Sequence, residues 1–130
     1  MSQATSSETV LLVEDEHSVR VMMRIVLETA GYRVLEASNG AEAISCAGQH
    51  HDKIHLLATD VVMPGGVSGP ILAAQLAALH PGLRVLFISA HSDEVITRHG
   101  VTAEKHPFLR KPFTHAELLR AIDETASQNY

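Results

Sequence analysis

The stretch that most constrains the fold is residues 55–64, in which an apolar run ends in a single carboxylate, Asp60, and a proline closes the segment. A short continuous apolar run bounded by chain-breaking residues is typical of a strand that is buried on both faces of a sheet. In open α/β sheets, ligands bind outside the carboxyl ends of the strands. The pattern therefore predicts a central strand that carries Asp60 to a ligand-binding edge.

The composition is that of one globular domain. The chain has 130 residues, of which 45% are hydrophobic and 19% charged, and a domain of this length buries roughly two-thirds of its unfolded surface. The net charge of −5 opposes direct binding to nucleic acid, because phosphate backbones require a basic surface. A single cysteine, Cys46, excludes an internal disulfide and favours a reducing compartment.

The ends of the chain are more polar than its middle. Residues 1–8 lack the basic start and apolar stretch of a secretory signal, and no apolar run reaches membrane-spanning length. We therefore expect a cytoplasmic protein that makes no membrane contact. Residues 1–8 are expected to form a flexible N-terminal segment, residues 9–127 the domain itself, and residues 128–130 a C-terminal tail.

Segments of strand and helix character alternate along the chain. Apolar and β-branched runs predict strands at residues 9–13, 32–37, within 55–64, at 83–89 and at 107–110. Apolar positions spaced by three and four, with capping residues before them, predict helices at residues 17–30, 41–48, 71–79, 92–98 and from Thr114 onwards. Parallel neighbours need right-handed crossovers, so we predict an α/β fold with a doubly wound, five-stranded parallel sheet of flavodoxin-like order 2-1-3-4-5.

This strand order places the first and third strands side by side. Their carboxyl ends would then bring together Glu14, Asp15 and Asp60. Three carboxylates in one cleft repel one another, and each is pushed toward its neutral form unless a cation compensates them. A hard divalent ion with oxygen ligands suits this need, and Mg²⁺ commonly holds phosphates in such sites. We therefore expect these three residues to bind Mg²⁺.

Two further side chains are expected at the same edge. Lys111, at the end of the fifth strand, supplies a mobile positive charge suited to a phosphoryl oxygen. Ser89, at the end of the fourth strand, supplies a hydroxyl group. A carboxylate, a metal ion, an ammonium and a hydroxyl at one rim indicate a phosphoryl-acceptor site, because phosphoryl transfer depends on positioning and on neutralising charge.

These residues, in this order and spacing, resemble the receiver domain of two-component response regulators. The resemblance spans residues 9–127 and rests on four motifs: Glu14-Asp15, Asp60-Val61-Val62-Met63-Pro64, Ser89-Ala90 and Lys111-Pro112-Phe113. The predicted strand order is also that of this family. The segments around Asp60 and Lys111 are similar to receivers attached to hybrid sensor histidine kinases.

The resemblance implies a role for each matching position. Asp60 would accept a phosphoryl group from a phosphohistidine on a sensor histidine kinase or a histidine phosphotransfer protein, making the domain a signalling module rather than an enzyme. The backbone carbonyl of Val62 would complete the Mg²⁺ ligands. Ser89 and Phe108 would form the conformational switch, and Lys111-Pro112 falls where the family often has a cis peptide bond.

Some positions depart from the family pattern. Glu14 replaces the more common aspartate, which suggests a longer arm or a bridging water, and Phe108 lacks the hydroxyl of a tyrosine switch. The alternative for Phe108 is ordinary core packing without a switch. Val62 and His91 occupy positions at which the family tunes phosphoryl lifetime, and we expect His91 to matter more because apolar Val62 cannot orient a water. The histidines at 50, 51 and 55 lack metal-ligand spacing and are expected to be solvated.

The first predicted helix carries a further signal. Val21 and Ile25 lie one turn apart and off the apolar stripe of this helix. Singly exposed apolar residues are common, but the pair could also dock the helices of a kinase beside Asp60. The last predicted helix has no charge pattern that decides for or against a homodimer on phosphorylation.

Two other functions compete with the phosphorelay receiver. A pseudo-receiver would have the fold without phosphorylation, and the loss of Asp60 or Lys111 would favour it, but both are present. A Mg²⁺-dependent phosphohydrolase with an aspartyl nucleophile usually has a second acid two residues beyond the nucleophile. In this chain that position is Val62.

Overall fold

The structure is a computed structural model that describes residues 8–50, 52–63, 66–91, 93–98, 100–101 and 106–127. Its centre is a parallel sheet of five strands in the order β2-β1-β3-β4-β5. The strands are β1 (Thr9–Val13), β2 (Arg33–Ala37), β3 (Leu56–Asp60), β4 (Arg84–Ser89) and β5 (Phe108–Arg110). The predicted fold class and strand order are confirmed.

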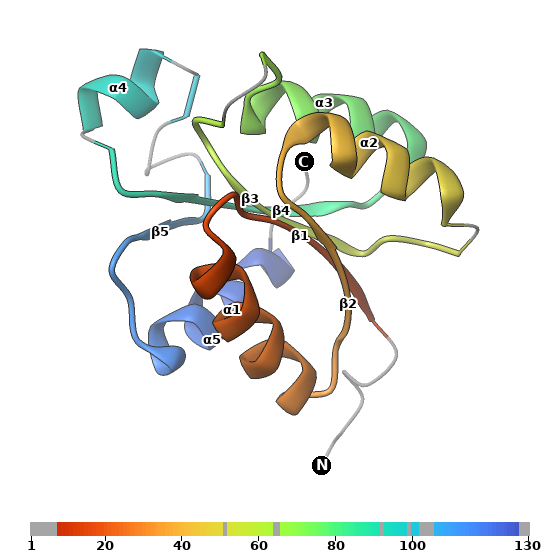
Figure 1. Ribbon diagram of the computed structural model, residues 1–130, viewed down its shortest axis with the longest axis horizontal. Helices are drawn as coiled ribbons and strands as arrows, with labels where there is room; N and C mark the ends of the chain where they lie inside the picture. Colours follow the sequence, from red (N-terminus) through yellow and green to blue (C-terminus); the bar gives the residue numbers. More distant parts are fainter. Residues whose placement is uncertain are drawn as a thin grey trace.

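The helices cover both faces of the sheet. They are α1 (His17–Thr29), α2 (Gly40–Gln49), α3 (Gly69–Leu79), α4 (Asp93–Arg98) and α5 (His115–Glu124), followed by the 3₁₀ turn η2 (Thr125–Ser127). Figure 1 shows α1 and α5 together below the sheet and α2 and α3 together above it. This arrangement is the expected result of right-handed crossovers between parallel strands. Within the described residues, no helix has both the length and the apolar character to cross a bilayer.

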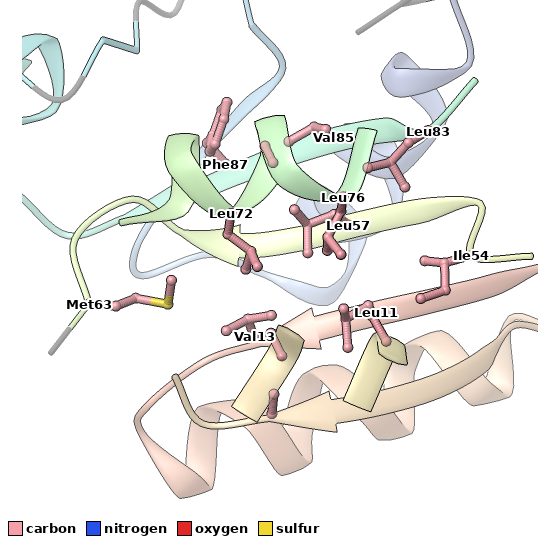
Figure 2. Packing of buried hydrophobic residues seen from close by; sticks show 14 of the residues in the cluster. Leu11, Val13, Ile54, Leu57, Met63, Leu72, Leu76, Leu83, Val85 and Phe87 are labelled. Carbon is pink, nitrogen blue, oxygen red and sulfur yellow. The ribbon is translucent and has the colours of Figure 1, made fainter. Parts of the chain in front are cut away.

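The central strands are apolar because helices cover them on both sides. Every residue of β1 and β3 is buried, as the continuous apolar run predicted. On one face, Leu11 and Leu57 pack beneath α2 and α3, and Figure 2 shows Leu72 and Leu76 of α3 pointing toward this face. On the other face, alternate residues of the same strands pack against α1 and α5. The edge strand β2 is more exposed.

Capping residues are present at the starts of three helices, and a glycine follows the end of a fourth. The side chains of Asn39, Ser68 and Thr114 accept hydrogen bonds from the backbone N–H groups of the first turns of α2, α3 and α5. The capping box of Thr114 and Glu117 is complete. Gly31, just after α1, has a φ of 105°, which suits the residue that ends a helix.

The predicted boundaries differ from the observed ones by one residue at several ends, as for α1, which ends at Thr29 instead of residue 30. Other predictions fall outside the described residues. These are residues 1–7 of the flexible segment predicted over residues 1–8, residue 92 of the helix predicted at 92–98, and the tail at 128–130. Pro64, which closes the segment around Asp60, and His51 are also outside the described residues.

Polar contacts connect the segments at the amino ends of the strands, at the opposite end of the sheet from Asp60. The Arg84 guanidinium donates to both carboxylate oxygens of Glu8, at 3.1 and 2.8 Å, and to Thr125 Oγ1 at 3.2 Å. His55 differs from the expectation of a solvated histidine, because it is half-buried and its Nδ1 accepts from the backbone N–H of Thr9. Burial lowers the pKa of His55, which keeps the ring neutral and able to accept.

Two leucines on α3 test the packing of the core. Leu76 is 1% exposed and Leu79 is 69% exposed. We expect Leu76→Ala to lower the free energy of unfolding by about 3 kcal/mol, because it removes buried methyl groups and leaves a cavity. Leu79→Ala, the matched control, should change it by less than about 0.5 kcal/mol. Urea unfolding followed by circular dichroism measures both, and equal effects would contradict the assignment of the buried face.

Candidate functional site

Three carboxylates meet at the carboxyl ends of β1 and β3. Val13, the last residue of β1, pairs with Thr59 of β3, so the residues that follow them, Glu14 and Asp60, lie level at the edge of the sheet. One carboxylate oxygen from each of Glu14, Asp15 and Asp60 falls within 4.8 Å of the other two. The structure therefore brings together the three acids that the sequence analysis grouped.

Lys111 reaches this cluster from the end of β5. Its Nζ lies 2.7 Å from Glu14 Oε1 and 3.1 Å from Asp60 Oδ1. The strand register explains the approach, because Ser89 of β4 pairs with Arg110, and the backbone N–H of Lys111 donates to the carbonyl of Ser89. The Lys111-Pro112 peptide bond is cis, as the resemblance implied.

Burial and a neighbouring carboxylate both act against the ionised form of Asp60. It is 4% exposed, and its Oδ2 is buried without a hydrogen-bond partner among the described residues. Burial and, next, the Glu14 carboxylate raise the pKa of Asp60 to about 8, although Lys111 acts in the opposite direction. A single lysine therefore does not neutralise this cluster of acids.

Lys111 and Glu14 form an ion pair within the cluster. Burial alone would lower the pKa of Lys111, but the carboxylates of Glu14 and Asp60 raise it above its usual value. Glu14 is fully buried and its Oε2 accepts from the backbone N–H of Glu16. Glu16 itself is exposed at the start of α1, as expected of an ordinary acid at a helix start.

A small cleft opens beside Asp60. It has a volume of about 100 Å³ and is lined by Asp15, Asp60, Val62, Ile88, Ser89, Ala90, His91 and Lys111. Asp15 is exposed at its mouth. Ser89 is buried at the end of β4, and its Oγ accepts from the backbone N–H of His91 at 2.9 Å. Most of the predicted site residues therefore line one polar cleft.

The backbone behind Asp60 is held by the start of α3. The N–H of Gly69 donates to the carbonyl of Val61 at 2.8 Å. A Cβ atom on Gly69 would overlap the carbonyl oxygen of Asp60 and lie 3.1 Å from Val61 Cα. Only glycine fits this close approach, so α3 can pack directly against the end of β3.

The remaining predicted residues lie outside the cleft. Phe108 begins β5, is half-buried, and packs at the border of the core, with the Arg110 guanidinium 5.4 Å from its ring centre. Val21 and Ile25 line a groove of about 440 Å³ along α1 that also includes His115. Ile25 is 53% exposed, so these two residues form a surface rather than part of the acidic site.

Arg20, which the sequence did not indicate as a site residue, contacts the backbone of the acidic cluster. Its Nη1 donates to the backbone carbonyl of Glu14 at 2.9 Å, and its Nε to Glu36 Oε1 at 3.2 Å. Arg20, Arg24 and Glu28 recur at helical spacing with apolar residues between them, a pattern that is typical of a solvent-facing helix surface. No signal in the sequence distinguishes Arg20 from its neighbour one turn later.

The geometry fits a divalent cation and a phosphoryl group. Within the part of the chain that the structure describes, the buried Oδ2 of Asp60 lacks a partner, and the cluster holds three carboxylates against one ammonium. Carboxylate oxygens close together suit the hard cations Mg²⁺ and Ca²⁺. Lys111 and the Ser89 hydroxyl, which line the same cleft, are donors for phosphoryl oxygens.

Comparison with known proteins agrees with this geometry. Residues 10–123 match the family model of the response regulator receiver domain. The chain belongs to the response regulator receiver family. It is thus a receiver domain of the kind found in two-component signalling, and the resemblance stated from the sequence is confirmed.

Relatives of this receiver include parts of longer proteins and one protein of similar length. It is 35% identical over 120 residues to the sensor kinase CckA of Brucella abortus, covering 92% of this chain but only 13% of that kinase. It is 30% identical to the response regulator receiver protein CpdR of the same organism, covering 88% of this chain and 93% of CpdR. The chain therefore matches one domain of the kinase and nearly all of CpdR.

Solved structures give the same result. A response regulator receiver protein from Sinorhizobium medicae superposes with a TM-score of 0.79 at 28% identity, covering 92% of this chain and 94% of that one. The receiver domain of the hybrid histidine kinase CckA superposes with a TM-score of 0.71 at 35% identity, covering 90% and 97%. The second structure fits the similarity to hybrid-kinase receivers noted in the sequence.

The raised pKa of Asp60 predicts a pH-dependent cost in stability. Its value of about 8 in the folded chain exceeds the ordinary 3.8, so between these values the folded chain retains a proton that the unfolded chain releases. Stability should therefore fall as the pH rises from about 4 to about 8. Over this window the gain from Asp60→Asn should grow, reaching at least about 1.4 kcal/mol, the equivalent of one pKa unit.

The measurement is urea unfolding of both chains at several pH values in metal-free buffer. Asp123→Asn is the matched control, because Asp123 is exposed on α5 and far in sequence from the cluster. Its effect should not vary with pH in this way. A gain from Asp60→Asn that is the same at low and high pH would contradict the electrostatic explanation.

Proposed function

We propose that this receiver accepts a phosphoryl group from a phosphohistidine onto Asp60, in a Mg²⁺-dependent reaction, and signals through the resulting conformational change. One observation carries the proposal: the buried Asp60 carboxylate has an oxygen without a partner among the described residues, two acids within 4.8 Å and the Lys111 ammonium at 3.1 Å. This set combines a nucleophile, a cation site and a compensating charge at the carboxyl end of the sheet.

The metal ion would be held by Glu14, Asp15 and Asp60 together with the backbone carbonyl of Val62. The unpartnered Asp60 oxygen and the excess of carboxylates over Lys111 support this set. When bound, Mg²⁺ would neutralise charge on the phosphoryl oxygens and lower the cost of ionising Asp60. Because Glu14 also contacts Lys111, it would serve the site through its charge even if a water separates it from the ion.

Transfer requires an ionised Asp60. A carboxylate oxygen of Asp60 would attack the phosphorus of the phosphohistidine while the phosphorus–nitrogen bond breaks on the opposite side. The bonding electrons leave with the imidazole nitrogen of the donor, and an acyl phosphate forms on Asp60. Lys111 would pair with one phosphoryl oxygen, and Ser89 would donate its hydroxyl to another.

The switch would follow from the hydroxyl of Ser89. In the described structure Ser89 Oγ accepts from the His91 backbone, so its proton is available to a phosphoryl oxygen. Ser89 pairs with Arg110 of β5, and Phe108 lies two residues earlier on the same strand, at the border of the core. Movement of Ser89 toward the phosphoryl group would therefore change the space open to Phe108. Helix α4, β5 and α5 would carry the change to a partner.

Phosphorylation can be tested with phosphoramidate, a small donor that contains a phosphorus–nitrogen bond. With MgCl₂ present, we expect intact-protein mass spectrometry to detect a single added phosphoryl group that is lost in Asp60→Asn and with EDTA. Asp52→Asn, which changes an exposed aspartate beyond α2, is the matched control and should be modified like the parent. A parent chain that stays unmodified would favour a receiver fold that binds partners without phosphorylation.

The donor protein would dock along α1. The groove with Val21 and Ile25 adjoins a second hollow lined by Met22, Ala90, Lys111 and Phe113 among others, and Ala90 and Lys111 also line the cleft at Asp60. An apolar surface that leads from α1 to the acceptor suits the helices of a sensor histidine kinase or a histidine phosphotransfer protein. We propose these proteins as the partners.

Docking and chemistry can be separated by substitution. We expect Val21→Glu with Ile25→Glu to slow transfer from a phosphorylated histidine phosphotransfer protein on the order of tenfold or more, because an apolar contact becomes an unpaired charge. Modification by phosphoramidate should stay unchanged. The matched control is Ile71→Glu with Leu79→Glu, which adds the same charge on the exposed side of α3. Equal rates for both double variants would exclude α1 as the docking surface.

A further inference from the structure

Arg20 of α1 lies at the junction between the acidic site and the edge of the sheet. Its side chain is only 16% exposed and contacts the turn after β1, the strand β2 and the first turn of its own helix. Nη1 donates to the carbonyl oxygen of Glu14, Nε donates to Glu36 on β2, and Nη2 donates to His17 Nδ1 at 3.0 Å. A planar guanidinium can hold these groups at the same time, whereas an ammonium is a point charge.

The Glu14 carbonyl is the first backbone acceptor after β1. The N–H of Glu14 still pairs with Ala37 of β2, and the chain then turns into α1 within three residues, Glu14 to Glu16. Asp15, the exposed acid of the cluster, lies in the middle of this turn. The Arg20 contact therefore fixes the peptide group that joins the buried acid to the exposed one.

We infer that Arg20 is a positioning residue for the Mg²⁺ site, which holds the Glu14-Asp15 peptide so that both carboxylates face Asp60. The inference rests on the proposed function, because it assumes that the three acids bind the metal. Arg20 touches neither the metal ligands' carboxylates nor the acceptor. It acts through the backbone of the turn, and Glu36 anchors it from β2.

The charge of Arg20 and its positioning role predict opposite changes in Mg²⁺ affinity when the residue is removed. If only charge mattered, the loss of a cation beside the cluster would strengthen Mg²⁺ binding, because like charges repel. If position matters, the loss of Arg20 weakens binding, since groups that orient metal ligands typically contribute tenfold or more to affinity. The sign of the change therefore separates the two explanations.

Arg24 provides a matched control. It lies one turn further along α1, and its Nε is 2.9 Å from the second carboxylate oxygen of the same Glu36. It carries the same charge and pairs with the same partner, but the structure gives it no contact with Glu14. Arg24→Ala thus removes a cation and its ion pairs with Glu36 and Glu28, while leaving the Glu14 carbonyl bound to Arg20.

The test is isothermal titration calorimetry with MgCl₂ at constant ionic strength. We expect Arg20→Ala to weaken Mg²⁺ binding by about tenfold, while Arg24→Ala stays within about twofold of the parent, as expected for an exposed ion pair. Arg20→Lys keeps the charge but loses the planar fork, so it should also bind more weakly than the parent. If Arg20→Ala does not fold, as judged by urea unfolding, Arg20→Lys carries the test.

A second readout needs no metal. The N–H of Glu16 donates to the Glu14 carboxylate, so its hydrogen exchange reports on the order of the turn. Exchange at Glu16 should be faster in Arg20→Ala than in Arg24→Ala. A parent that binds Mg²⁺ no more tightly than the Arg20 variants would overturn this role of Arg20 alone. A parent that binds no Mg²⁺ would overturn the proposed metal site and this role together.

Discussion

The candidate site depends on a cluster of acids at the carboxyl end of the sheet whose charge a single lysine does not balance. Folding places Asp60 at the end of a buried strand with Glu14 beside it, and one lysine, Lys111, lies between them. Burial removes the water that would otherwise screen these charges. A chain without a use for such a cluster would gain stability by replacing one of the acids. The arrangement therefore costs stability, as sites built for binding commonly do.

The architecture around this edge is what allows the acids to be so close. Parallel neighbours must be joined by crossovers, and the switch in direction between β1 and β3 leaves their ends open to a ligand. Gly69 lets α3 approach the backbone of Asp60, and the register of β4 and β5 delivers Lys111 from the other side. The charged groups thus come from the ends of three strands, Glu14 and Asp15 from β1, Asp60 from β3 and Lys111 from β5, and the sheet fixes their positions.

The hydrophobic pattern of the sequence was enough to predict the central strands and, from their ends, the acidic cluster. The apolar runs identified β1 and β3 because their residues are buried on both faces, and the residues at the strand ends then identified the cluster. The contacts of Lys111 with both Glu14 and Asp60 could not be predicted, because they depend on side-chain reach and on the register of β5. Arg20 was missed since its contact with a backbone carbonyl has no counterpart in the hydrophobic pattern. The acceptor role of the half-buried His55 was missed for the same reason.

The contacts of Arg84 have a consequence for how such a domain connects to others. Because one guanidinium holds both Glu8 and Thr125, the beginning and the end of the described fold lie at the same pole of the molecule, opposite the strand ends that carry Asp60. A polypeptide that enters and leaves at one pole can be inserted into a longer chain, or permuted through a short linker, without obstructing the opposite pole. The meeting of both ends at Arg84 is therefore compatible with the same fold occurring in proteins of different domain organisation.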